Sequence, residues 1–578
     1  MSIYDERPWL KSYDPLVRHE LKPSEETYVD LLMKGLNFRP ESSAFHFLGR
    51  TFTFRELDRL SLAFASFLRS QGCSPGDVVG INLPNTPQYL IALAGTFRAG
   101  CAASEVSPLL TPKEMAYQLN DLKAKALVTL DAIYENRVQK IKNDIPSVGC
   151  ILPTGIADFL PPYKRILGKL LKKIPSGKVE PITGKHVVPF KEAVSKHLSD
   201  VPLASVKPDD TCVIQYTGGT TGMPKGAVLT HRNMVANLYQ VAEWLDLMMG
   251  GGPVCSGFPF FHQAGLYFGM IAMAWAYTQC LIPDPRNTKH MCKEISAHRP
   301  SMMLHVPSLY QMLMDDPGFS RLDFSSCNVC LSGASPFSKE AVASLEAIVG
   351  KGKVVELYGM TEASPVIAMN PLKGTKKIGS VGLPVQGTLI KLVDVETGTR
   401  EVPLGEEGEV IISGPQIMKG YHGKPEESAN SLRKLGDRTW LYTGDVARMD
   451  ENGYFFLVDR TKDMLIVSGF KVFSREVEEV LCEHRAVELC AIIGIPNPER
   501  PDSQIVKAVI QLSRDAQGKD HAKIEKEILD HCRENLTPYK VPKLIEFTDA
   551  IPLTAVGKVD KKVLRSAGAQ DQIKKTGG

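Results

Sequence analysis

A glycine- and threonine-rich segment at residues 215–226 is the strongest local indication of chemistry in the chain. Within the nine residues from 217 to 225 lie three threonines, three glycines and one lysine, directly after an apolar stretch. Glycines let a backbone wrap closely and direct N–H groups at an anion. Hydroxyls add donors and the ammonium group adds charge. The segment is therefore predicted to bind a polyphosphate through Thr217, Gly218, Gly219, Thr220, Thr221, Gly222 and Lys225.

This segment is not a Walker A loop, because Lys225 is followed by Gly226 rather than by Ser or Thr. Taken alone, a mobile turn without a ligand is the alternative. Other motifs follow it in order along the chain: Leu357-Tyr-Gly-Met-Thr-Glu362, Tyr442-Thr-Gly-Asp445 with Asp459-Arg-Thr-Lys-Asp463, Ser468-Gly-Phe-Lys471 and Pro552-Leu-Thr-Ala-Val-Gly-Lys558.

Together these motifs resemble those of the adenylate-forming superfamily, which includes acyl- and aryl-CoA synthetases, nonribosomal peptide adenylation domains and beetle luciferases. The resemblance spans roughly residues 40–565. Within the family, the chain looks most like bacterial long-chain fatty acid–CoA ligases. The features it shares with them are Gly219, an early Trp9-Leu-Lys-Ser-Tyr segment and a basic amphipathic stretch at 163–174.

The resemblance implies an α/β fold with a large N-terminal domain of two α/β layers, a small β-barrel subdomain and a small mobile α+β C-terminal domain. Apolar periodicity agrees, because helical patterns alternate with short apolar strands before residue 380 and glycine turns become frequent after it. The expected parts are an AMP-binding domain at 1–459 with its β-rich subdomain at about 380–455, a hinge at 460–463, a catalytic-lysine domain at 464–565 and a disordered tail at 566–578. Ser474 is expected to cap a helix.

The family activity that the resemblance implies has two steps. A small-molecule carboxylic acid and ATP give acyl-AMP and pyrophosphate, and coenzyme A then gives the thioester and AMP. The first step needs positioning and charge neutralisation at phosphorus. The implied catalytic residues are Lys558, Glu362, Thr217 and His262. Glu362 is the implied Mg²⁺ ligand, and nucleotide contacts fall to Gly333, Ala334, Tyr358, Gly359, Thr361, Asp445 and Arg460.

The second step implies a domain rotation, since CoA must approach where the Lys558 domain lies. Lys462 matches the hinge position, and Gly469 and Lys471 would then line a pantetheine tunnel. His262, in Phe258-Pro-Phe-Phe-His262, resembles a gate or carboxylate neighbour rather than a general base. A thiol attacking an adenylate needs little help, because some thiolate is present at neutral pH.

The acid itself is less well specified by the sequence. A long- or medium-chain fatty acid is the main hypothesis, with a pocket expected from Phe260 to Ala274 and near Gly333. Leu266 lies about where some long-chain enzymes place a gating Trp. The alternatives are an aryl- or alicyclic-acid CoA ligase, and a fatty acyl-AMP ligase or adenylation enzyme that loads a carrier protein.

The basic stretch at 163–174 has an apolar stripe and a cationic face. The stripe is Tyr163, Ile166, Leu167, Leu170, Leu171 and Ile174, and the face is Lys164, Arg165, Lys169, Lys172 and Lys173. Such a pattern suits a helix at a membrane surface. Packing of the stripe on the protein is the alternative. The expected location is therefore cytoplasmic, with peripheral contact to the inner membrane surface through this stretch left open.

Composition excludes several classes of protein. The 578-residue chain has a net charge of +3, too balanced to predict a nucleic-acid partner, and oligomerisation is left open.

Its N-terminus lacks a secretory signal, which predicts a reducing compartment for the twelve cysteines. Cys327 and Cys330 are interpreted as half-buried strand residues rather than a redox or metal site. Residues 250–283 carry no charge and are interpreted as a buried helix and strand rather than a membrane span.

Overall fold

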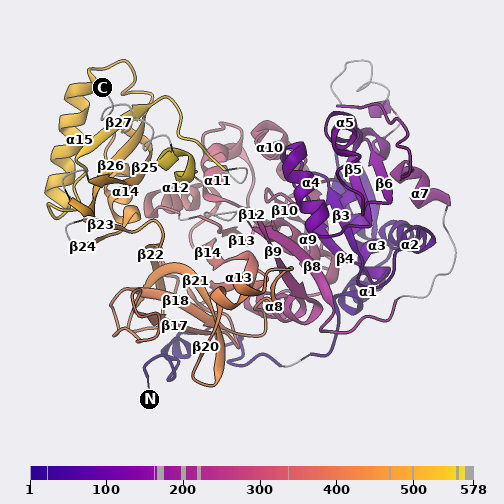
Figure 1. Cartoon of the computed structure of the whole chain (residues 1–578), viewed down its shortest axis with the longest axis horizontal. Coiled ribbons are helices and arrows are strands. Elements are labelled where there is room, and N and C mark those ends of the chain that lie inside the picture. The colour runs from indigo at the N-terminus through magenta and orange to yellow at the C-terminus, as the bar shows by residue number, and fades with distance from the viewer. Residues whose placement is uncertain are drawn as a thin grey trace. The chain divides into compact units, whose positions relative to one another are not determined.

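The computed structural model (Figure 1) describes residues 2–22, 24–161, 163–165, 175–196, 204–217, 223–335, 337–467, 470–497, 500–554 and 559–566. The chain forms two compact units. The larger unit comprises Arg7–Leu389 and Ser413–Leu441. The smaller unit comprises Met1–Glu6, Ile390–Ile412 and Tyr442–Gly578. Short 3₁₀ helices occur at η1 (Pro8–Ser12), η2 (Val138–Ile141), η3 (Ile156–Phe159), η4 (Phe319–Arg321) and η5 (Thr361–Ala363).

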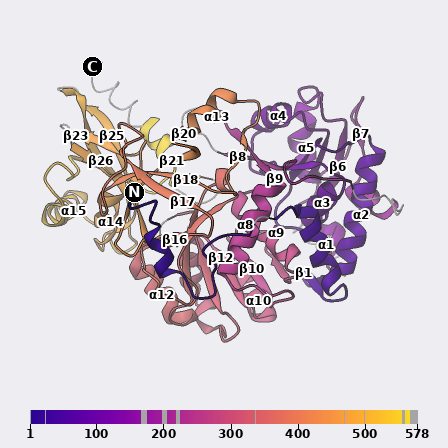
Figure 2. The same cartoon turned by 90° about the horizontal axis from the view of Figure 1, so that it is seen from below.

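An eight-stranded sheet forms the first layer of the larger unit. Its strands, in spatial order, are β19 (Gly420–Tyr421), β9 (Lys225–Thr230), β8 (Thr211–Thr217), β4 (Ala102–Glu105), β3 (Val78–Asn82), β5 (Ala126–Leu130), β6 (Cys150–Thr154) and β7 (His186–Val187). Pairing is parallel from β8 to β7 and antiparallel at β8–β9 and β9–β19. Figure 2 shows α4 (Pro112–Asp121) and α5 (Asp131–Asn136) on one face, and α1 (Tyr28–Phe38), α2 (Phe54–Ser70) and α3 (Pro87–Arg98) on the other.

A nine-stranded sheet forms the second layer. Its strands, in spatial order, are β16 (Leu383–Pro384), β15 (Val366–Met369), β14 (Val354–Gly359), β13 (Val329–Ser332), β12 (Met302–His305), β10 (Val254–Ser256), β11 (Gln279–Leu281), β1 (Ser43–Phe47) and β2 (Arg50–Thr53). One buried cluster joins this sheet to α10 (Thr288–His298), α11 (Pro307–Met314) and α12 (Lys339–Val349). Helices α7 (Phe190–Lys196), α8 (His231–Trp244), α9 (Gln263–Ala274) and α13 (Pro425–Ser431) also belong to this unit.

Three smaller sheets follow. A five-stranded sheet contains β17 (Leu389–Val393), β18 (Gly408–Ser413), β21 (Arg438–Met449), β20 (Leu432–Leu435) and β22 (Phe455–Arg460). A two-stranded sheet contains β23 (Leu465–Val467) and β24 (Phe470–Val472), and a three-stranded sheet contains β25 (Val487–Asn497), β26 (Arg500–Leu512) and β27 (Leu544–Thr548). Helices α14 (Ser474–Cys482) and α15 (His521–Asn535) also belong to this part of the chain. The predicted α/β class is confirmed.

Local sequence signals explain where helix α2 begins but not where helix α14 begins. Helix α2 begins at Phe54, because Thr53 accepts from the Glu56 amide and Glu56 reaches back to the Thr53 amide. The prediction for Ser474 is wrong, since it is the first residue of α14 and Phe473 is the N-cap. The Ser474 hydroxyl instead donates to Asp459 at 3.2 Å and accepts from Lys561 Nζ at 2.7 Å.

The uncharged stretch at 250–283 forms part of the core. It contains β10, α9 and β11, and nearly every residue of α9 is buried, so the prediction of a buried helix followed by a buried strand is confirmed. Among the residues that the structure describes, no helix has the length and apolarity needed to cross a bilayer. Cys330 lies in β13 and Cys327 precedes it. Both are fully rather than half buried, because they belong to the cluster under α10–α12.

Candidate active site

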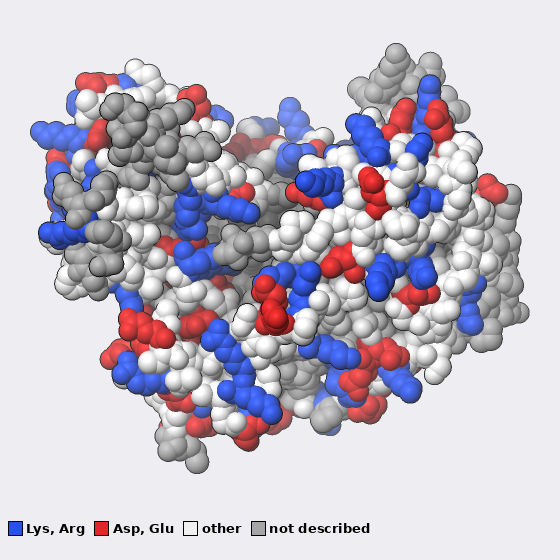
Figure 3. All heavy atoms as spheres, viewed as in Figure 1, with Lys and Arg blue, Asp and Glu red and all other residues white. Residues whose placement is uncertain are grey.

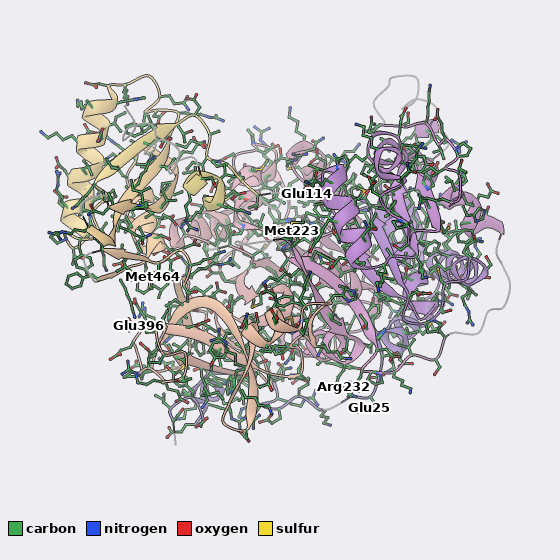
Figure 4. All side chains as sticks on the ribbon, in the orientation of Figure 1. Glu25, Glu114, Met223, Arg232, Glu396 and Met464 are labelled. Carbon is green, nitrogen blue, oxygen red and sulfur yellow. The ribbon has the colours of Figure 1, made fainter. Side chains whose placement is uncertain are left out.

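The glycine- and threonine-rich segment connects two antiparallel strands. Thr217 ends β8, Lys225 begins β9, and the two residues are Cα partners. The predicted site residues 218–222 lie outside the described residues, so the structure fixes only the base of this hairpin. Met223 follows them and is 55% exposed (Figure 4). The antiparallel pair β8–β9, called the phosphate hairpin after its predicted ligand, therefore brings the hydroxyl of Thr217 and the ammonium group of Lys225 to the same end of the sheet.

Lys225 contacts an acidic element that the sequence analysis missed. Its Nζ forms an ion pair with Glu427, in the short helix α13. It also lies 5.2 Å from the ring centroid of Tyr421, a distance at which a cation is attracted to an aromatic face. Strand β19, which carries Tyr421, pairs with β9 beside Ala227 and Val228. The ammonium group is thus held by partners more than 190 residues away in sequence.

Tyr421 joins the phosphate hairpin to the predicted metal ligand. Its hydroxyl donates to Glu362 Oε1 at 2.8 Å. Burial and the neighbouring Glu362 carboxylate raise the pKa of Tyr421, so this phenol remains a donor over the physiological range. The Met418 amide also donates to the Glu362 carbonyl at 2.8 Å. No local motif marks Tyr421, and only the pairing of β19 with β9 reveals its place.

The nucleotide-binding candidates of the larger unit gather at the carboxyl ends of two parallel strands. Gly333 and Ala334 follow β13, Tyr358 and Gly359 end β14, and Thr361 with Glu362 forms η5. Strands β13 and β14 are parallel neighbours. Ligands in open α/β sheets bind at this edge. The structure brings all six predicted residues together there.

Two glycines at this edge are required by close packing. A Cβ on Gly333 would lie 2.6 Å from Leu357 Cδ1, and one on Gly359 would lie 2.1 Å from the Pro365 carbonyl oxygen. Larger side chains would therefore displace the turn. Ala334 adopts a left-handed conformation, with φ of 69°. Tyr358, which directly precedes Gly359 in β14, is buried and 7% exposed.

Glu362 suits the Mg²⁺ ion expected with ATP. Its carboxylate is a hard oxygen donor of the kind that Mg²⁺ prefers. The side chain is mostly buried, and the Tyr421 hydroxyl fixes one of its oxygens. Among the described residues no group of three or more His, Cys, Asp or Glu could hold a metal ion. A single carboxylate such as Glu362 suits Mg²⁺, because this ion usually keeps several waters and binds through one or two carboxylates together with phosphate oxygens.

The aromatic and histidine segment at 258–262 lies beside strand β8 of the phosphate hairpin. Gln215, in β8, donates to the Phe261 carbonyl at 3.2 Å. Tyr89 donates to the Phe260 carbonyl at 2.8 Å, and Asn85 holds the Phe260 amide at 2.7 Å. His262 is the N-cap of α9, and its Nδ1 accepts from the Ala264 amide at 3.3 Å. That bond fixes the imidazole plane at the start of the helix.

A cavity opens behind this segment. Residues from α9, from β10, β11 and β12 and from nearby loops line it: Asn85, Leu247, Val254, Ser256, Phe260, Phe268, Gly269, Ile271, Ala272, Tyr277, Gln279, Cys280, Leu281, Met302 and Leu304. Five of these fall in the predicted range from Phe260 to Ala274. The walls from β10 to β12 were not predicted, and Gly333 is not among the lining residues. The cavity is largely apolar.

A buried carboxyl group lies one strand away from the phosphate hairpin. Glu105 ends β4, which pairs with β8, and it is 2% exposed. Loss of solvation raises the pKa of Glu105 to about 8, and Tyr89 offsets only part of that rise. Near neutral pH this side chain is therefore mostly a neutral acid. The sequence analysis did not single it out.

The smaller unit holds the candidates for ribose binding. Asp445 and Arg460 are cross-strand partners in β21 and β22, and Arg460 Nε lies 3.0 Å from Asp445 Oδ1. Lys471 pairs at 3.3 Å with Glu396, which is labelled in Figure 4. Burial, with Arg460 nearby, lowers the pKa of Lys462. Gly469 and Lys558 lie outside the described residues.

Comparisons with known proteins agree with the geometry. The AMP-binding enzyme family matches residues 34–422, and the AMP-binding enzyme C-terminal domain matches residues 476–558. A long-chain-fatty-acid–CoA ligase of Bacillus subtilis (strain 168) is 37% identical over 571 residues, covering 97% of this chain and 98% of that protein. A ligase of the same name from Escherichia coli O6:H1 is 34% identical, covering 96% of this chain and 97% of that protein.

Two further similarities concern aromatic acids. A feruloyl-CoA synthase of Amycolatopsis sp is 32% identical, covering 91% of this chain and 96% of that protein. The crystal structure of the anthranilate CoA ligase AuaEII in complex with anthranoyl-AMP has a TM-score of 0.82 at 26% identity, covering 95% of this chain and 99% of that chain. These matches span the phosphate hairpin, both sheets and the smaller unit. The resemblance inferred from the ordered motifs is confirmed, and the chain belongs to the AMP-binding enzyme family.

Proposed function

We propose that the protein is an ATP-dependent fatty acid–CoA ligase. It converts a carboxylate and ATP to acyl-AMP and pyrophosphate, and then acyl-AMP and CoA to the thioester and AMP. The observation that carries the choice of acid is the apolar cavity behind Phe260, since an alkyl chain gains free energy wherever it leaves water for apolar surface. The relatives named for long-chain fatty acids, matched over nearly the whole chain, support the same choice.

In the first step, charge must be neutralised on the polyphosphate while the carboxylate attacks the α-phosphorus. Lys225 and the Thr217 hydroxyl lie together at the base of the hairpin and would contact phosphate oxygens. When bound at Glu362, Mg²⁺ would supply positive charge to those oxygens. Thr361 would reach the α-phosphate, and Lys558 would contact both reacting groups. Because positioning dominates this chemistry, the fixed backbone at Gly333 and Gly359 contributes directly.

The adenosine would be bound by other residues. The Tyr358 ring would stack on adenine, and Asp445 would accept the ribose hydroxyls. The ion pair of Arg460 with Asp445 holds that carboxylate in place. In the second step, rotation about Lys462 would exchange Lys558 for Gly469 and Lys471, which would line the path of CoA. This rotation and the domain boundaries at 459, 463 and 565 are part of the proposal.

An aromatic acid is the second candidate substrate. Phe260, Phe268 and Tyr277 line the cavity, and an aromatic acid could stack against them. The feruloyl-CoA synthase and the anthranilate CoA ligase point the same way. A location in the cytoplasm, with contact to the membrane surface through 163–174, completes the proposal, because long-chain acids partition into bilayers.

A panel of acids tests the proposal. Saturated acids of increasing chain length, benzoate-type acids and alicyclic acids are each incubated with ATP and Mg²⁺, with and without CoA, and AMP release is measured. We expect sustained AMP release with long- or medium-chain acids only when CoA is present. Activity confined to aromatic acids favours the second candidate. Turnover with a carrier protein but not with CoA contradicts the proposal.

A further inference from the structure

Two cysteines of the smaller unit lie unusually close together. Cys482 is the last residue of α14, and Cys490 lies in the middle of β25. Their sulfur atoms are 3.5 Å apart and joined by a thiol hydrogen bond. A disulfide needs about 2 Å, so a small side-chain movement would bring the sulfurs to bonding distance. Helix α14 and strand β25 pack together in one buried cluster, and this packing fixes the positions of the two cysteines relative to each other.

The two thiols have different surroundings. Cys482 is exposed, whereas the other eleven cysteines of the chain are buried. Cys490 is 5% exposed, and its sulfur lies 3.5 Å from both the Cys482 sulfur and the Glu478 carbonyl oxygen, which are alternative acceptors for its single proton. Hydrogen bonding from Cys490 lowers the pKa of Cys482 and raises that of Cys490. Redox-sensitive cysteines are typically accessible, rich in thiolate and next to a second thiol that resolves the oxidised form.

We propose that Cys482 and Cys490 form a thiol–disulfide redox site that reacts with hydrogen peroxide. The Cys482 thiolate attacks one peroxide oxygen, the O–O bond breaks and hydroxide leaves as water, giving a sulfenic acid. The Cys490 sulfur then attacks the Cys482 sulfur, the S–O bond breaks and a second water leaves with the Cys490 proton. The two thiols lose two electrons and two protons in total, and the peroxide is reduced to two waters.

The chain contains an internal control for this proposal. Cys327 and Cys330 have sulfurs 3.7 Å apart, nearly the same separation. Both are fully buried under α10–α12, at 1% and 0% exposure. Proximity alone would make the two pairs equally reactive. If access to Cys482 starts the reaction, only the pair in the smaller unit should oxidise in the folded protein.

The experiment uses the reduced full-length protein, treated with hydrogen peroxide, quenched with an alkylating agent and digested with trypsin without reduction. Trypsin cuts after Arg485, so Cys482 and Cys490 fall on separate peptides and their disulfide appears as a cross-linked pair. Cys327 and Cys330 share the peptide 322–339, where a disulfide appears as the loss of two hydrogen atoms. One mass spectrum therefore reports both pairs.

We expect the cross-linked peptides to form while the 322–339 peptide stays reduced. Cys490→Ser should leave a sulfenic acid on Cys482 that dimedone traps, and Cys482→Ser should abolish the cross-link. Cys532→Ser, which alters a buried thiol of the same unit, should leave it unchanged. Equal oxidation of both pairs, or a Cys482 sulfenic acid in the wild type that never becomes the disulfide, overturns the proposal.

Discussion

Glu362 is the residue that we propose binds Mg²⁺, and its carboxylate accepts a hydrogen bond from the Tyr421 hydroxyl. Glu362→Gln keeps the size of the side chain and an oxygen for the Tyr421 hydroxyl, but it removes the negative charge. We expect acyl-adenylate formation to fall by about 10²–10³-fold, as for loss of one preorganised charge contact. Pyrophosphate–ATP exchange in the presence of a long-chain acid measures it.

The matched control is Tyr421→Phe, which removes only the hydroxyl that orients Glu362. Its effect should be smaller, because a single hydrogen bond to a charged group contributes about 1.5–3 kcal/mol, whereas loss of a preorganised charge contact costs about 2.7–4 kcal/mol. If Glu362→Gln exchanges pyrophosphate at the wild-type rate, Glu362 is not part of the phosphate site.

Glu105 should make stability depend on pH. Its pKa rises from 4.5 to about 8 on folding, so between these values the folded protein binds a proton that the unfolded chain has lost. The contribution of Glu105 to stability is thus fully present below about pH 4.5 and is lost as the pH rises toward 8. The slope in this window is at most about 1.4 kcal/mol per pH unit.

The test compares wild type with Glu105→Gln, whose neutral side chain has the same shape. Denaturant midpoints are measured from about pH 5 to about pH 9, and because all other groups are shared, the difference isolates this carboxyl. The variant should gain stability relative to wild type as the pH rises. Parallel stability curves would show that Glu105 titrates normally.

At the scale of elements, helix α13 supplies a carboxylate to Lys225, the residue that we propose binds the polyphosphate. The Lys225–Glu427 ion pair is partly exposed, with side chains 24% and 45% exposed. Such pairs contribute about 0.2–1 kcal/mol. Glu427→Gln should therefore lower the KM for ATP by a factor of about 1.4 to 5.

The neighbouring acid of α13 provides the control for this change. Glu426→Gln alters the net charge equally but not the ion pair, and it should leave the KM for ATP unchanged. Steady-state kinetics at saturating acid and CoA compares the two variants. An equal shift in both would mean that general charge, rather than the contact with Lys225, sets the affinity.

The segment between β22 and β23 is the second element with a testable role. Lys462→Pro fixes φ near −65° and should trap one orientation of the C-terminal domain. We expect pyrophosphate exchange to survive while thioester formation from supplied acyl-AMP and CoA is lost. Lys462→Ala, which leaves φ free, is the control and should retain both. If Lys462→Pro runs both half-reactions at wild-type rates, the hinge lies elsewhere.

Elements also show how far the sequence could predict the site. The α/β class and the glycine- and threonine-rich segment from Thr217 to Lys225 follow from local patterns, because glycine and hydroxyl spacing act within a few residues. The role of Gly333 comes only from the family resemblance. Tyr421 and Glu427 could not be found in this way, since they reach Lys225 only through the pairing of β19 with β9. The cavity walls of β10 to β12 likewise depend on the order of strands in the sheet.

At the scale of the whole molecule, the property to be tested is the proposed contact of the protein with a membrane surface. Acidic and basic residues are interspersed on the face shown in Figure 3. The proposed attraction to an anionic leaflet is assigned to the basic stretch at 163–174. Of that stretch only residues 163–165 are described. Tyr163 is 64% exposed, and Lys164 Nζ donates to the Leu48 carbonyl at 2.8 Å. Each basic residue near an anionic surface contributes about 1 kcal/mol.

Vesicle co-sedimentation tests this attraction. The protein should bind anionic vesicles at low salt, release them as salt rises, and lose most binding when Lys164, Arg165, Lys169, Lys172 and Lys173 are changed to Gln. A control with the same loss of charge changes five exposed residues of the smaller unit: Arg514, Lys519, Lys523, Lys526 and Lys543. Equal binding by both variants, or none by the wild type, would contradict a membrane role for 163–174.

The uneven exposure of the thiols has a practical consequence. Because Cys482 alone among twelve cysteines is exposed, a maleimide dye should attach at one place on the unaltered protein. That place lies at the end of α14, after the proposed hinge. The fluorescence of such a dye would follow the C-terminal domain in real time, as ATP, acid and CoA are added in turn, without any cysteine being removed first.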